Sequence, residues 1–244
     1  MIEVLLFLLA FLIFATSVYL KFWYAKKTIF EKTIRKSFTW TKYAIIASTL
    51  LVLLGVYQLA FPVSDLYYLL LYLTALVVAL LQYKTLYYYV GVMKEFGFIE
   101  KQEKFKPLSF ILSLVVLSLI VFAVMNLVNI RISLESVNDK MLVFLFGIYS
   151  LVSLNLLYWS KTIKEKLSEE LLVSGYNTML YAFAVFSFLV QSFILYSFSR
   201  YQELYSLLVL LVLVFMFLLW ESSSHFCCSD NSFAKVFGVQ NKKR

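Results

Sequence analysis

The chain has 244 residues, of which 62% are hydrophobic and only 15% charged, with a mean hydropathy of +0.85 and a formal net charge of +8. Soluble domains are nearer 45–50% apolar and about 25% charged, so this composition excludes an ordinary soluble globular fold. The excess positive charge gathers in segments between apolar runs, which is typical of a membrane protein and not of a nucleic-acid-binding surface.

Long apolar segments predict seven membrane-spanning helices. About 20 helical residues cross a hydrocarbon core of about 30 Å. The predicted spans are about 4–24, 43–61, 66–90, 108–130, 141–159, 176–198 and 204–220. The expected fold class is therefore an all-α membrane protein, a bundle of seven transmembrane helices in residues 1–221 followed by a tail at 222–244.

The first apolar segment is not expected to be a cleaved secretory signal. A signal carries its positive charge before the apolar region. Here Glu3 precedes that region and Lys21, Lys26 and Lys27 follow it. This order predicts a retained first helix whose N-terminus is exported.

The distribution of basic residues predicts the orientation of the bundle. If seven helices alternate in direction, one side receives all 22 Lys and Arg residues except Arg131, Lys140 and Arg200. Lys and Arg are concentrated in cytoplasmic loops. We therefore expect the N-terminus outside the cell, the C-terminus in the cytoplasm, and a multi-pass protein of the plasma membrane.

The segment KFWYAKKTIFEKTIRKSFTWTK at 21–42 forms the first expected cytoplasmic loop. Anionic lipid headgroups of the inner leaflet attract each basic residue by about 1 kcal/mol near the surface. Phe30, Ile34 and Phe38 recur every four residues, which predicts a short amphipathic helix on that leaflet. A docking surface for a cytoplasmic protein is the alternative, and nucleic acid is not an expected partner. The predicted lipid or partner surface is Lys26, Lys27, Lys32, Arg35 and Lys36.

The third span continues with residues compatible with a helix until about Phe96. A helix from Leu66 to Phe96 would be roughly 45 Å long and would project into the cytoplasm. Tyr87, Tyr88 and Tyr89 are then expected to form an interfacial belt.

Groups for catalysis or metal binding are missing from the spans. No Asp or Glu lies inside an apolar run, which argues against a proton pump. His225, Cys227 and Cys228 lie together in the expected tail, and a structural zinc site normally needs four ligands. We therefore expect no enzyme activity, no catalytic residues, no metal and no cofactor.

Amide side chains inside the spans offer the only candidate ligand site. Gln58, Asn126 and Gln191 share a depth in the outer halves of their helices and are predicted to line an outward-facing ligand pocket. Amides in lipid also bond helices to one another, which is the simpler interpretation. A second layer of amides, nearer the cytoplasm, contains Gln82, Asn155 and Asn177.

These features favour a non-enzymatic seven-helix sensor or receptor-like protein that acts through a cytoplasmic partner. Two alternatives stay open. The first is a small transporter or lipid-handling protein, which would need a polar path or a lipid cleft. The second is a structural subunit of a larger membrane complex, for which an aromatic content of 19% would provide contact area.

Overall fold

The computed structural model describes residues 2–28, 32–61, 65–95, 137–166, 171–199 and 202–228, and these ranges are helical apart from a bend at Phe61. The predicted helix at 108–130, including Asn126, lies outside these ranges. The helices are α1 (Ile2–Thr28), α2 (Lys32–Ala60), α3 (Asp65–Glu95), α5 (Val137–Lys166), α6 (Leu171–Ser199) and α7 (Gln202–Cys228).

Five of these helices are long and apolar enough to cross a membrane. The qualifying segments are Ile34–Gln58, Leu66–Lys94, Lys140–Lys161, Ser174–Ser197 and Leu204–Phe226. α1 contributes a shorter apolar stretch, Leu9–Trp23. The chain is therefore an all-α, multi-pass integral membrane protein.

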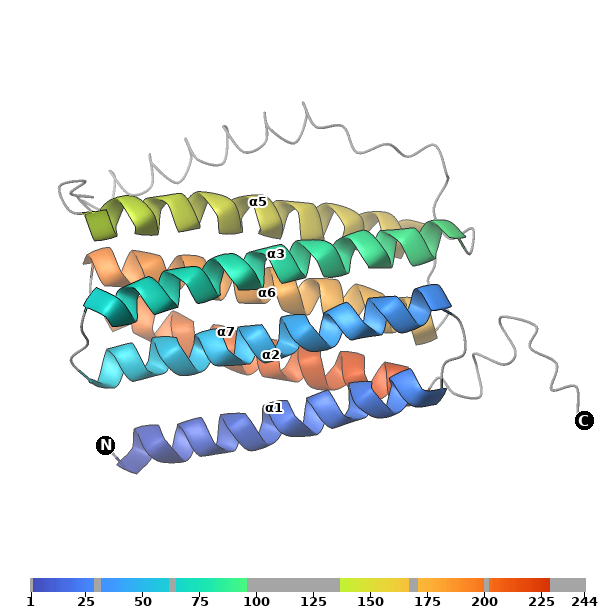
Figure 1. The fold of residues 1–244 in the computed structure, drawn as a ribbon, viewed down its shortest axis with the longest axis horizontal. Coiled ribbons are helices and arrows are strands. Elements are labelled where there is room, and N and C mark those ends of the chain that lie inside the picture. The colour runs from blue at the N-terminus through green and yellow to red at the C-terminus, as the bar shows by residue number, and fades with distance from the viewer. Residues whose placement is uncertain are drawn as a thin grey trace, which may run out of the picture.

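The helices lie side by side in a bundle (Figure 1). α1, α3, α5 and α7 run in one direction, while α2 and α6 return (Figure 1). We call the end where α1 begins the N-terminal end and the end where α1 finishes the basic end. α3 finishes at the basic end and α5 begins at the N-terminal end.

Contacts between neighbouring helices close the six described helices into a ring. α1 packs on α2, α2 on α3, α3 on α5, α5 on α6, α6 on α7, and α7 on α1. α6 also contacts α3 and is the most enclosed helix, with 67% of its apolar span buried against 22% for α7. α7 instead exposes Leu210, Leu213 and Phe217, an apolar face suited to lipid tails.

Basic residues of the described helices are segregated along the bundle. All of them except Lys140 lie in the half at the basic end. The charge asymmetry that predicts the orientation is therefore present in the folded arrangement.

The basic segment differs from the expected surface helix. α2 begins at Lys32 and continues without a break into the span. Ile34 and Phe38 are each 1% exposed and pack inside the bundle, so the prediction of a short amphipathic helix on the leaflet is wrong. The centroid of the Phe38 ring lies 4.8 Å from that of the Phe226 ring. Packing against other aromatic rings buries these apolar side chains more completely than contact with lipid headgroups would. Arg35 remains exposed.

α3 extends to Glu95, close to the expected end. Its tyrosines differ in exposure, because Tyr87 is exposed, whereas Tyr89 is buried and hydrogen-bonded to Thr41 of α2. The prediction that Tyr89 belongs to the interfacial belt is therefore wrong. α7 also continues to Cys228, beyond the expected span, because Phe226 is buried against its neighbours.

Candidate functional site

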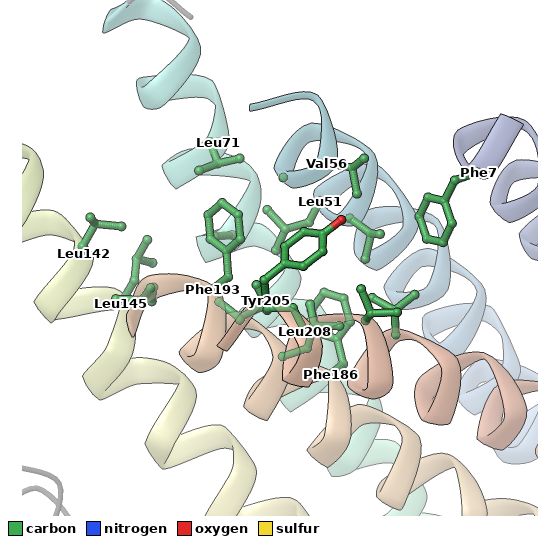
Figure 2. A pocket seen from close by; sticks show the side chains of 18 residues that line it. Phe7, Leu51, Val56, Leu71, Leu142, Leu145, Phe186, Phe193, Tyr205 and Leu208 are labelled. Atoms are coloured by element: carbon green, nitrogen blue, oxygen red, sulfur yellow. The ribbon is translucent and has the colours of Figure 1, made fainter. Parts of the chain in front are cut away.

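A cavity of about 450 Å³ lies between the helices, in the half of the bundle nearer the N-terminal end. Eighteen of the described residues line it, and every described helix contributes at least one (Figure 2). Phe7 of α1, Leu71 of α3 and Leu142 of α5 stand at its sides. Ligand pockets in proteins usually measure about 300–1,000 Å³, so the cavity is large enough for a small molecule.

The lining is almost entirely apolar. The described lining residues are Leu, Val, Ile, Ala, Gly and Phe, with Tyr205 as the single exception among them. Figure 2 shows the Tyr205 hydroxyl oxygen directed across the cavity toward the side of Val56 and Phe7. A charged occupant would lose its hydration here with almost nothing to replace it, so the cavity suits an uncharged, mainly hydrocarbon molecule.

Small residues create part of this space. Gly55 of α2 and Ala75 of α3 both line the cavity. A Cβ atom added at Gly55 would meet Phe193 Cε2 at 3.7 Å, an ordinary van der Waals contact. A longer side chain at position 55 would therefore occupy the cavity without a collision at its first carbon.

The cavity reaches the surface of the bundle along α7. Tyr205 and Val209 line it and are nevertheless 49% and 44% exposed. The neighbouring residues Leu210 and Leu213 are exposed too and belong to the apolar outer face of α7. The mouth therefore opens sideways, onto a surface that faces lipid.

The predicted amide pocket is not the cavity itself. Gln58 and Gln191 lie near the same end of the bundle, on α2 and α6, but neither belongs to the lining. Gln58 Oε1 and Gln191 Nε2 are buried without a hydrogen-bond partner among the described residues. Asn126, the third member of the predicted pocket, lies outside those residues.

Polar side chains are also buried just beyond the cavity, toward the basic end. Thr41 and Tyr89 are bonded across α2 and α3. Ser48 and Gln82 each lie two helical turns from this pair toward the N-terminal end, so they lie at a similar level of the bundle. Both have 0% exposure, and neither Ser48 Oγ nor the two polar atoms of Gln82 find a partner among the described residues.

A cluster of tyrosine and hydroxyl side chains joins α2, α3 and α6 nearer the basic end. The Tyr176 hydroxyl of α6 lies 2.8 Å from Ser37 Oγ of α2. The ring of Tyr176 meets that of Tyr89 edge to face, with 4.3 Å between centroids, and Tyr89 bonds Thr41. Figure 1 places these segments of α2, α3 and α6 in the basic half. We call these four residues the tyrosine cluster.

Three phenylalanines extend the tyrosine cluster to the ends of α1 and α7. Phe226 of α7 contacts Tyr176, Phe38 and Phe22, with ring centroids 5.2, 4.8 and 5.4 Å apart. Gly175 makes this approach possible, because a Cβ there would lie 2.9 Å from Phe226 Cε1. The close approach fixes α7 on α6 at the basic end.

Lysines of the basic half lie over aromatic rings. Lys21 Nζ is 3.3 Å from the centroid of the Trp220 ring and donates to Ser224 Oγ at 3.3 Å. Lys84 Nζ lies 4.6 Å from the Trp40 centroid. Such contacts hold an ammonium group beside the bundle while its charge remains near water or headgroups.

The predicted basic surface is divided between two helix ends. Lys26 and Lys27 lie in the last turn of α1, and Lys32 begins α2. Arg35 and Lys36 follow on α2, and their side chains are exposed. The fold therefore brings these five residues to one end of the bundle.

Hydroxyl groups bond several of the described helices to one another. Tyr149 donates to the Ala75 carbonyl oxygen at 2.8 Å, and Ser222 donates to the Gly175 carbonyl oxygen at 2.9 Å. Aromatic and hydroxyl residues are frequent throughout the spans, so the sequence did not single out these pairs.

No group of three or more His, Cys, Asp or Glu residues suited to a metal ion occurs in the described part of the chain. Comparisons with family models, with curated proteins and with solved structures give no match for this chain.

Proposed function

We propose that the chain is a non-enzymatic, receptor-like protein of the plasma membrane, with seven transmembrane helices. It binds an uncharged apolar ligand in the cavity and acts on a cytoplasmic protein through its basic end. The observation that carries the proposal is the cavity, because its apolar lining is contributed by every described helix. With the N-terminus outside, as the basic residues predict, the cavity lies in the outer half of the membrane.

The same helices connect the cavity to the basic end. α2 lines the cavity at Gly55 and carries Arg35 and Lys36 at its other end. Its 29 residues span about 43 Å as one helix. The tyrosine cluster ties this helix to α3 and α6 on the way. A ligand that changes the position of α2 would therefore change the surface offered to a partner and to anionic headgroups.

A lipid-handling protein is the second candidate. It is favoured by one observation, the sideways opening at Tyr205 and Val209. This function needs the cavity but no cytoplasmic partner, so the two proposals differ in what accompanies the purified protein.

The test is extraction of the full chain from native membranes into lipid nanodiscs, followed by mass spectrometry of co-purifying proteins and small molecules. We expect one retained apolar molecule and one stoichiometric protein partner. Gly55→Leu fills the cavity and should release the molecule. Gly91→Leu is the matched control, because a Cβ at this glycine meets nothing within 4 Å.

Changing the basic surface tests the second half of the proposal. Gln in place of Lys26, Lys27, Lys32, Arg35 and Lys36 should lose the partner and keep the molecule. A retained molecule without any partner in the wild-type chain would favour lipid handling. A partner whose recovery is unaffected by Gly55→Leu would favour a structural subunit, and the absence of both would contradict the proposal.

A further inference from the structure

We infer that the occupant of the cavity is a single-chain lipid with an uncharged hydrogen-bonding head, which enters sideways from the membrane with its head at Tyr205. The inference names the ligand class of the proposed function and rests on it for the site. It follows from the volume, the lining and the mouth of the cavity.

The lining selects a hydrocarbon chain. Around the buried interior, Leu145, Phe186 and Leu208 present only carbon atoms. A hydrocarbon chain that comes from the bilayer finds apolar contacts here like those it leaves, whereas a polar group without a partner costs roughly 2–7 kcal/mol. An occupant with several polar groups along its length is therefore disfavoured.

Tyr205 selects the head. Its hydroxyl is the one polar side-chain group among the described residues that line the cavity, and it extends into the cavity from a half-exposed residue beside the mouth. A hydroxyl donates one hydrogen bond and accepts others, so it can pair with an alcohol, an ester or an amide. It supplies no charge, and among the described residues that line the cavity there is no Lys, Arg, Asp or Glu to neutralise a charged head.

The position of the mouth favours entry of the lipid from the side, out of the bilayer. Val209 and Tyr205 belong to α7, the helix with only 22% of its apolar span buried. Leu210 and Leu213 continue the apolar surface beside the mouth. A chain that leaves the bilayer here exchanges lipid contacts for protein contacts and never crosses water.

The experiment uses the full chain in nanodiscs of phosphatidylcholine and phosphatidylglycerol. The probe is a 16-carbon alcohol with a photoreactive diazirine in its chain, and labelled residues are mapped by mass spectrometry. We expect labelling of Leu145, Phe186 or Leu208, with competition by the unlabelled alcohol. The same chain ending in a quaternary ammonium group should label these residues at least tenfold less.

Two variants test the mouth. Tyr205→Phe should weaken competition by the alcohol roughly two- to tenfold, the equivalent of one hydrogen bond. Val209→Trp should narrow the entrance and reduce cavity labelling. Val214→Trp is its control, because Val214 is exposed on the same helix and is not part of the lining. Both tryptophans replace exposed residues, so neither should prevent folding.

Several results would overturn the inference. They are equal labelling by the charged probe, labels confined to lipid-facing residues such as Leu210 and Phe217, and unchanged competition after Tyr205→Phe. Failure of the receptor proposal is distinguishable from these results, because it would leave cavity labelling intact and remove only the cytoplasmic partner.

Discussion

The hydrogen bond between Tyr176 and Ser37 predicts unequal effects for the removal of its two partners. Ser37 Oγ donates its single proton to the Ile34 carbonyl oxygen at 2.7 Å. The Tyr176 hydroxyl must therefore donate to Ser37 Oγ, 2.8 Å away. Ser37→Ala leaves a buried donor without an acceptor, whereas Tyr176→Phe removes the donor and leaves Ser37 bonded to its own helix.

The expected magnitudes follow from this asymmetry. A buried group left without a partner costs about 1–3 kcal/mol, and a typical hydrogen bond contributes about 0.5–1.5 kcal/mol net. Ser37→Ala should therefore lower the free energy of unfolding by about 2 kcal/mol and Tyr176→Phe by about 1 kcal/mol. The double variant should resemble Tyr176→Phe alone, because no buried donor remains unpaired.

The assay is unfolding of the purified chain in mixed micelles by titration with sodium dodecyl sulfate, followed by circular dichroism. Thr74→Ala is the control, because Thr74 Oγ1 donates only within its own helix, to the Leu70 carbonyl oxygen at 2.8 Å. This change should stay within about 0.5 kcal/mol. A larger loss for Tyr176→Phe than for Ser37→Ala, or additive losses in the double variant, would refute the proton assignment.

Three further changes test the packing. Gly175→Ala should destabilise the bundle by about 1 kcal/mol, because the clash with a buried ring outweighs the gain in helix propensity, while Gly91→Ala should be neutral or stabilising by up to about 1 kcal/mol in the same titration. Gln82→Leu should not lower the unfolding free energy, because it removes a buried amide without a described partner; a loss above about 1 kcal/mol would contradict this. Lys21→Gln should cost about 0.5–1 kcal/mol by removing the ammonium from the tryptophan ring, and unchanged stability and tryptophan fluorescence would count against the contact.

The positions of the helices could be predicted from the sequence because a membrane span is recognised as a run of about 20 mainly apolar residues. Runs of apolar residues located the described helices, and Lys and Arg identified the basic end. The start of α2 could not be predicted in this way. Lys32, Arg35 and Lys36 interrupt the apolar run, so the sequence alone did not show that Ile34 and Phe38 continue the same buried helix.

The cavity could not be predicted because it depends on packing between helices distant in sequence. Gly55 and Ala75 are recognised as lining residues only when the packing of α2 and α3 against α6 and α7 is known. The amides were predicted to form a site because they are rare polar groups in the spans. Tyr89 was predicted to be interfacial and Tyr176 was not singled out, because tyrosine is common in this chain and an interfacial tyrosine and a buried one look alike in sequence.

The contact between the first and last helices has a consequence for biogenesis. α1 packs on α2 and α7, and its Lys21 lies over Trp220 of α7. About 200 residues separate α1 from the end of α7, which is about 10–40 s of synthesis at typical bacterial and eukaryotic rates. Once α1 is inserted, the part of its surface that packs on α7 has no protein partner until α7 is made. A nascent chain arrested before α7 should therefore be a preferred substrate for membrane chaperones and quality-control proteases.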